Sequence, residues 1–152
     1  MISIEVEEAA WTDALPDVEV RAEAAARAAV VAARVEGELT ILLTDDATQA
    51  ELNQRFRAKS GSTNVLSFPA APQPGAKVLG DLSLAYGVCA AEAEAQGKSL
   101  GDHLSHLVVH GVLHLAGRDH MSEAEAEAME AEERTILQAL GVADPYVAER
   151  AA

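Results

Sequence analysis

The pattern of apolar and polar residues predicts four short β-strands. Residues 2–7 (ISIEVE) alternate with a period of two, as in a strand that buries one of its faces. Residues 38–44 (ELTILLT) are a short apolar run, which is also typical of a strand. Residues 63–69 (TNVLSFP), ended by Pro69, and residues 78–86 (VLGDLSLAY) are predicted as the third and fourth strands.

Three segments between and after these strands are predicted to be helices. The first is an Ala-rich segment from Pro16 to about Gly37, because Ala and Arg favour helices and Gly favours helix ends. The second covers residues 47–58, where apolar residues recur on one face. The third is a short helix over residues 90–97.

Two capping boxes predict the last two helices. Ser99 is followed three residues later by an Asp, and Gly117 can end this helix in a left-handed cap. Ser122 is followed three residues later by a Glu, and this helix extends to about Leu140. Strands and helices do not alternate strictly, which favours an α+β fold over a parallel α/β design.

Length and charge limit the possible functions. The 152 residues are enough for one domain, and the formal net charge of −14 argues against unspecific binding to nucleic acid or to an anionic membrane. A site for a polyanion must therefore be a local exception. The N-terminus does not resemble a signal peptide, and no apolar stretch approaches ~18 residues, so we expect a soluble cytoplasmic protein without membrane contact. The single cysteine, Cys89, is expected to be a small buried thiol.

The segment HGVLHLAGRDH (residues 110–120) predicts a metal site. His110 and His114 are four residues apart and project from one face of a helix. A turn at Gly117 can bring His120 back over the same face as a third ligand. Three imidazoles on a tetrahedral Zn²⁺ leave one position open, which is typical of catalytic zinc.

The same spacing occurs in the metzincin proteases, whose motif is H-E-x-x-H-x-x-G-x-x-H. Their general base is the Glu after the first His, and here that position is Gly111. The spacing therefore indicates a metal hydrolase but argues against a protease of this type. We expect His106 to be a neighbour of the site and not a ligand, and His103 to lie at the surface. The Glu-rich run over residues 123–133 is expected to be the solvated face of the last helix.

Arg55, Arg57 and Lys59 form the densest basic cluster in this acidic chain. Taken alone, the cluster is typical of cations at the end of a helix, where they interact well with the helix dipole.

Together with the histidine segment, however, the stretch LNQRFR-K---TNVLSFP resembles the YbeY family. LGDLSL, EAEAME-E and the closing DPY add to this resemblance, which extends from about Leu52 to Tyr146. The chain departs from the family pattern at Ala58, Ser60 and Ser62, where the family usually has Gly, Asp and Pro.

The resemblance implies a fold, an activity and a set of site residues. YbeY proteins are bacterial, single-strand-specific, metal-dependent endoribonucleases that act in 3′-end maturation of small-subunit ribosomal RNA and in ribosome quality control. Their fold is α+β. By resemblance, His110, His114 and His120 bind one Zn²⁺ per chain, and Arg57 is the functionally important arginine. RNA, the small ribosomal subunit and its assembly factors are the implied partners.

We therefore expect one α+β endoribonuclease domain over residues 1–152. A four-stranded mixed sheet would pack against about five helices, with the metal site on a central helix and the following turn. Arg57 would offer a planar fork of donors to the phosphate, and Arg55, Lys59 and Arg118 would be weaker contacts.

Two acidic residues have alternative interpretations. Asp119 either orients a histidine or is a turn residue that hydrogen-bonds its own backbone, and Asp81 either lines the site or marks an exposed strand face. Two alternative functions also remain at this point: a metallohydrolase acting on another substrate such as peptide, and a non-catalytic ribosome-assembly protein with structural zinc.

Overall fold

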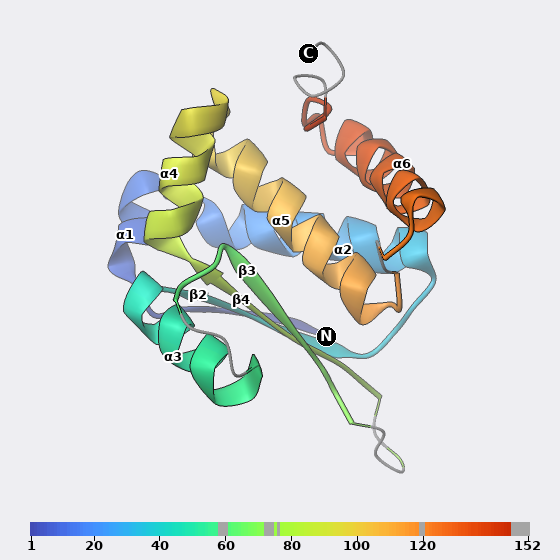
Figure 1. The fold of residues 1–152 in the computed structure, drawn as a ribbon, viewed down its shortest axis with the longest axis horizontal. Helices are drawn as coiled ribbons and strands as arrows, with labels where there is room; N and C mark the ends of the chain where they lie inside the picture. Colours follow the sequence, from blue (N-terminus) through green and yellow to red (C-terminus); the bar gives the residue numbers. More distant parts are fainter. Residues whose placement is uncertain (58–60, 72–74, 76, 119–120, 147–152) are drawn as a thin grey trace.

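A four-stranded mixed sheet forms the base of the molecule (Figure 1). The computed structural model describes residues 1–57, 61–71, 75, 77–118 and 121–146, apart from the side chain of residue 57. The strands are β1 (Ile2–Val6), β2 (Glu38–Thr44), β3 (Val65–Pro69) and β4 (Val78–Ala85). Their order in the sheet is β1-β2-β4-β3. The β1–β2 and β2–β4 pairs are parallel and the β3–β4 pair is antiparallel. The predicted α+β class is confirmed.

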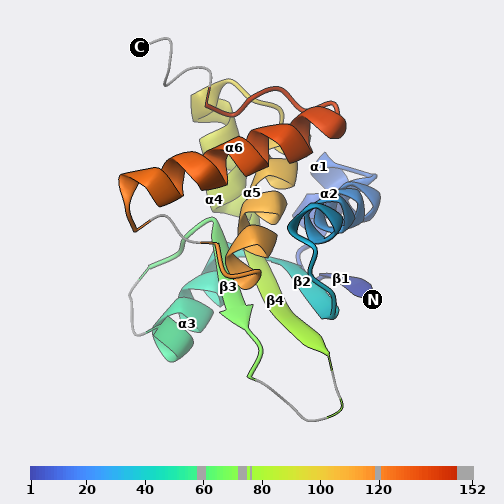
Figure 2. The same ribbon diagram turned by 90° about the vertical axis from the view of Figure 1, so that its right-hand side faces the viewer.

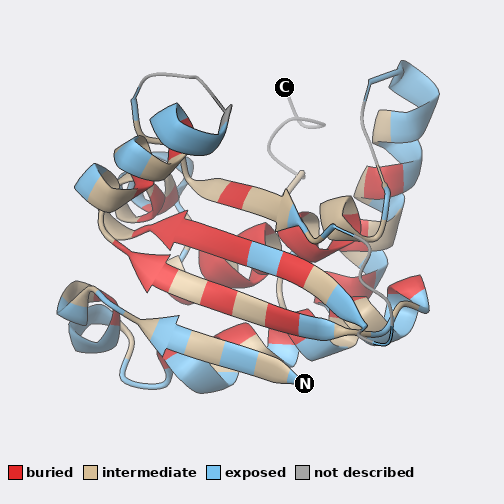
Figure 3. Ribbon diagram, turned by 90° about the horizontal axis from the view of Figure 1, so that it is seen from below, coloured by how far each residue is buried: buried red, intermediate tan, exposed pale blue. Residues whose placement is uncertain are grey.

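Helix α5 is the central helix of the layer that covers one face of this sheet. It contacts the sheet through β3 and β4, and it also packs against α2, α4 and α6. Helix α6 crosses the outer side of α5 (Figure 2), and α3 lies near one corner of the opposite face of the sheet (Figure 3). The helices of the described residues are α1 (Ala9–Ala14), α2 (Val18–Ala33), α3 (Asp46–Arg57), α4 (Tyr86–Gln96), α5 (Leu100–Leu115) and α6 (Glu123–Ala139).

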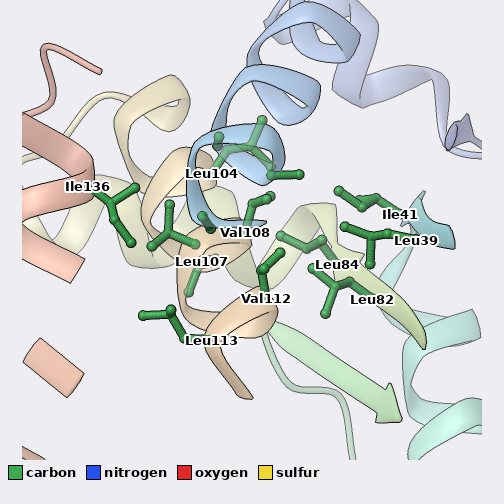
Figure 4. Packing of buried hydrophobic residues seen from close by; sticks show 14 of the residues in the cluster. Leu39, Ile41, Leu82, Leu84, Leu104, Leu107, Val108, Val112, Leu113 and Ile136 are labelled. Carbon is green, nitrogen blue, oxygen red and sulfur yellow. The ribbon is translucent and has the colours of Figure 1, made fainter. Parts of the chain in front are cut away.

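The core lies between α5 and the two central strands (Figure 4). In register, Ile41 of β2 is paired with Leu82 of β4, and Leu43 is paired with Leu84. These four side chains are fully buried, and Val108 of α5 is buried with them. Removing each such side chain from water stabilises the fold by about 1.5–3 kcal/mol. The apolar residues of β2 and β4 therefore form the surface against which α5 packs.

Both predicted capping serines are observed at the helix N-termini. The backbone N–H of Asp102 donates to Ser99 Oγ at 3.1 Å at the start of α5, and that of Glu125 donates to Ser122 Oγ at 3.1 Å at the start of α6. Helix α5 ends at Leu115, and Gly117, just beyond its C-cap, has a φ of 92° in the left-handed region, as predicted. The beginning and the end of the helix that carries the histidines are thus fixed by local sequence.

The sequence did not predict α1, so the described residues contain six helices and not five. The reason is tertiary: Trp11 in α1 is fully buried, and its indole N–H donates to the carbonyl oxygen of Thr44 at 3.1 Å. Helix α4 also begins at Tyr86, where the prediction still had a strand.

Cys89 is buried, as expected, and burial raises the pKa of its thiol. No helix in the described ranges is both long enough and apolar enough to cross a membrane.

Candidate active site

His110 and His114 lie side by side near the C-terminal end of α5. Their Nε2 atoms are 3.1 Å apart, and their ring centres are 4.6 Å apart. Two nitrogens that each lie 2.0–2.1 Å from one tetrahedral metal would be about 3.3 Å apart. The observed spacing therefore suits two ligands of one metal ion.

Glu133 of α6 holds His110 from the side opposite His114. Its Oε1 lies 2.5 Å from Nδ1 of His110, and its side chain is 0% exposed. A carboxylate at Nδ1 accepts the ring N–H and leaves the lone pair on Nε2. The nitrogen that faces His114 is therefore the one available to a metal.

The charge of Glu133 is stabilised by its donors. Burial raises the pKa of a carboxyl group, but hydrogen bonds with His106, His110 and Tyr146 outweigh this effect and lower the pKa of Glu133 to about 2. Glu133 is therefore ionised at neutral pH, and its buried charge is paired.

Tyr146 and His106 complete the surroundings of Glu133. The Tyr146 hydroxyl donates to Oε2 of Glu133, and Nε2 of His106 lies 3.2 Å from that hydroxyl and 3.5 Å from the same Oε2. His106 thus directs Nε2 toward the carboxylate, as a neighbour of the His110–His114 pair.

The prediction that residues 123–133 form a solvated face is wrong at Glu133. The earlier glutamates of this run are exposed or half-buried, but Glu133 is fully buried. It lies on the apolar stripe of α6 with Met129, Ile136 and Leu137, which all face the core. A glutamate on an apolar stripe was the signal in the sequence that could have identified this residue.

The prediction that His103 lies at the surface is also wrong. Its side chain is 4% exposed, and its Nε2 is 2.9 Å from Oε1 of Glu92. Burial lowers the pKa of His103, although the neighbouring Glu92 carboxylate acts in the opposite direction. His103 lies one turn before His106 on α5, outside the His110–His114 pair.

A cleft of about 890 Å³ opens beside the histidines. No described residue that lines it carries a carboxylate, although the chain has 25 Asp and Glu residues. This is the kind of local exception that a polyanion site requires in a chain with a net charge of −14. The lining residues are Phe56, Asn64, Val65, Ser67, Phe68, Pro69, His106, Leu107, His110, His114 and Tyr146.

Packing explains why Gly111 occupies the position of the protease base. A Cβ atom built at Gly111 would lie 2.7 Å from Cδ2 of Leu82. Position 111 therefore faces strand β4 and not the cleft. A side chain there would enter the core and would not reach a bound substrate.

The third predicted ligand, His120, and its neighbour Asp119 lie outside the described residues, as does Lys59. Within the described part of the chain, no group of three or more His, Cys, Asp or Glu side chains is arranged to hold a metal. Arg57 is the last residue of α3, directly after Phe56, which lines the cleft.

The other predicted contacts are distributed as follows. Arg55 is exposed and pairs with Glu51 at 3.2 Å, whereas Arg118 pairs with Glu132 of α6 at 3.0 Å. Asp81 is exposed on β4 and does not line the histidine cleft, so the interpretation as an exposed strand face holds.

Comparison with known proteins identifies the family. The sequence profile of the family described as Endoribonuclease YbeY matches residues 4–141. The chain belongs to the YbeY family. The match includes α5 with its histidine pair and Glu133 of α6, but it ends before Tyr146.

Individual YbeY relatives are similar over nearly their whole length. The chain is 52% identical over 155 residues to the Endoribonuclease YbeY of Paramagnetospirillum magneticum, covering 95% of this chain and 94% of the relative. It is 48% identical over 160 residues to that of Parvibaculum lavamentivorans, covering 97% of this chain and 86% of the relative.

The solution structure of TM1509 from Thermotoga maritima shares the fold, with a TM-score of 0.61 and 22% identity. The superposition covers 99% of this chain and 93% of that one. The family profile and the two relatives confirm the resemblance to YbeY proteins seen in the sequence.

Proposed function

We propose that this YbeY family member is a metal-dependent endoribonuclease that cleaves single-stranded RNA in 3′-end maturation of small-subunit ribosomal RNA and in ribosome quality control. The named activity of its relatives supports this reaction class. The whole chain, residues 1–152, acts as one catalytic domain in the cytoplasm, without membrane contact. Its partners are RNA, the small ribosomal subunit and the assembly factors of that subunit.

His110, His114 and His120 hold one zinc ion per chain in this proposal. The spacing of the two Nε2 atoms on α5 supports the first two ligands, and the carboxylate of Glu133 at Nδ1 keeps the lone pair of His110 on Nε2. When bound, zinc supplies a Lewis acid that polarises a phosphate oxygen and lowers the pKa of a water molecule to about 7.

Arg57 binds the scissile phosphate and stabilises the charge that develops on it. A guanidinium offers two parallel N–H donors to phosphate oxygens, and such preorganised donors stabilise a transition state by a few kcal/mol. The position of Arg57 directly after the cleft residue Phe56 supports this role. Arg55 and Lys59 make additional contacts with the RNA backbone.

The observation that carries this function is a cleft around a preorganised histidine pair whose described lining residues carry no carboxylate. Zinc analysis of the purified protein should find close to one equivalent per chain, and the protein should cleave a labelled single-stranded RNA but not the matching duplex. His114→Ala should lose most of the metal and the cleavage. Full zinc content in that variant, or equal cleavage of the duplex, would contradict the proposal.

Arg57→Ala separates phosphate chemistry from folding. Cleavage should fall roughly a hundredfold or more, while zinc content and melting temperature stay unchanged. Arg27→Ala is the matched control, because Arg27 is an exposed helical arginine on α2 that pairs only with Glu23 among the described residues. Normal cleavage by Arg57→Ala would remove this residue from the mechanism, and unfolding would make it structural.

A further inference from the structure

Phe56 at the end of α3 is an exposed aromatic side chain at the rim of the histidine cleft. Its exposed fraction is 61%, and it lines the cleft together with His110 and His114. Single exposed apolar residues are common on protein surfaces and need no explanation. The described residues include five other large exposed hydrophobic side chains, but none of those is aromatic and none lines this cleft.

The aromatic residues of the chain are concentrated at this cleft. The sequence contains only five Phe, Tyr and Trp residues, and three of them, Phe56, Phe68 and Tyr146, line it. The rings of Phe56 and Phe68 meet edge to face, with centres 5.7 Å apart and an angle of 70° between their planes. Phe68 is half-buried on β3 and its ring contacts that of Phe56, so the exposed ring has a fixed neighbour.

We propose that Phe56, supported by Phe68, is a stacking site for a nucleobase of the single-stranded RNA, and that it positions the strand at the histidine pair. The inference rests on the proposed RNA substrate and adds the residue that selects unpaired bases. Stacking on an aromatic ring is tolerant of sequence because every base has a π-face, and it requires a base that is not already stacked within a duplex. A stacking site of this kind gives a physical reason for preferring single strands.

Apolar stacking suits the charges around Phe56. The guanidinium carbon of Arg55, which pairs with Glu51, lies 6.0 Å from the centre of the Phe56 ring, and Phe56 also borders a second cleft lined by Glu5 and Asp81. With a net charge of −14, the protein repels RNA electrostatically at long range. Stacking of a base on an apolar ring contributes binding energy that does not depend on this charge.

Equilibrium binding tests the proposal directly. The zinc-loaded protein is titrated into a labelled, unstructured 2′-O-methyl RNA 12-mer, whose integrity is checked on a gel. Phe56→Ala and Phe56→Leu should both bind roughly 5- to 150-fold more weakly, whereas Phe56→Tyr should bind like the wild type. Phe56→Leu retains an apolar side chain against Phe68, so weaker RNA binding by this variant would result from lost stacking on the base and not from lost packing within the protein. Val31→Ala is the control, because Val31 is 72% exposed on α2 and does not line the cleft.

Two further measurements distinguish stacking from loss of a phosphate contact. An abasic backbone of the same length should bind equally to the wild type and to Phe56→Ala. The slope of log K against log salt should also stay unchanged in Phe56→Ala, because a lost phosphate contact would reduce it by about 0.7. A changed slope, or an equal loss on the abasic probe, would overturn the proposal.

A tryptophan at position 56 reports the contact itself. The emission of Phe56→Trp, measured against the wild-type signal of the buried Trp11, should be quenched by the base-bearing RNA and not by the abasic probe. Val31→Trp should show no such quenching. Equal quenching at both positions, or unchanged RNA affinity of Phe56→Ala in a protein that cleaves RNA, would contradict the stacking site but not the proposed RNA cleavage. Base-dependent quenching in a protein without cleavage supports the stacking site and contradicts the proposed reaction.

Discussion

The substitution Glu133→Gln tests whether the buried carboxylate controls the histidine pair. Glu133 accepts from His110 through one oxygen and from Tyr146 through the other. Glutamine has the same shape but only one accepting oxygen, and its NH₂ group is a donor. If the amide turns its NH₂ toward His110, Nδ1 must accept, and the ring proton moves to Nε2. The nitrogen that faces His114 is then blocked.

The magnitude follows from the loss of this carboxylate contact. Replacing a group that hydrogen-bonds a metal ligand typically costs 10- to 100-fold in metal affinity. Hydrogen bonds to charged groups contribute about 1.5–3 kcal/mol, which is a similar range. We therefore expect zinc affinity to fall by about 1.4–2.7 kcal/mol in Glu133→Gln, with a parallel loss of RNA cleavage at limiting zinc.

Competition with a chromophoric zinc chelator at pH 7.5 measures this change. Glu132→Gln is the matched control, because Glu132 is the preceding residue of α6 and also forms an ion pair, with Arg118, but its side chain is 34% exposed. We expect the control to bind zinc within about twofold of the wild type. Wild-type zinc affinity in Glu133→Gln, or an equal loss in both variants, would refute the reasoning.

Three further predictions concern the fold around the site. Gly111→Ala should lower the free energy of unfolding in urea by up to about 2 kcal/mol, because crowding of the new methyl group against buried Leu82 costs about 1–3 kcal/mol and the higher helix propensity of Ala returns about 1 kcal/mol, and a more stable variant would show that Leu82 moves aside at little cost. Burial lowers the pKa of His103 in the folded state. Between this lowered pKa and the ordinary histidine value of about 6.5, the unfolded chain therefore binds a proton at His103 that the folded chain does not. Stability should then fall as the pH drops below about 6.5, by at most about 1.4 kcal/mol per pH unit. His103→Gln should flatten this slope relative to the wild type, and an equal slope in both would contradict the assignment. Ser99→Ala should cost about 0.5–2 kcal/mol and Ser99→Asp much less, whereas equal losses would exclude a capping role.

Elements defined by local pattern were predictable from the sequence. The strands, the caps at Ser99 and Ser122 and the helix end at Gly117 all follow from residues within one turn or one pleat of each other. Helix α1 was not predictable in this way, because Trp11 is fixed by a carbonyl group 33 residues away in the chain.

At the site, too, features set by local sequence were predictable, whereas features set by contacts between distant segments were not. The spacing of His110 and His114 on one helix predicted that their rings lie side by side without any tertiary information, because residues four apart share a face. Glu133 reaches His110 only because α6 packs across α5, and nothing local to α6 specifies that crossing. His103 was misplaced for a related reason, since its partner Glu92 belongs to α4.

The placement of carboxylates around the histidine pair favours RNA over peptide as the substrate. A zinc protease needs a carboxylate in the cleft to take a proton from water, and a neutral peptide bond tolerates that charge. A phosphodiester is an anion, and at 4 Å a carboxylate would repel it by about 4 kcal/mol at an effective dielectric constant of 20. Here position 111 faces Leu82 in the core, and Glu133 lies on the side of His110 opposite His114, where its charge is neutralised by donors. The chain thus keeps a carboxylate that orients the imidazole and presents none from the described lining of the cleft, which is the arrangement that an anionic substrate requires.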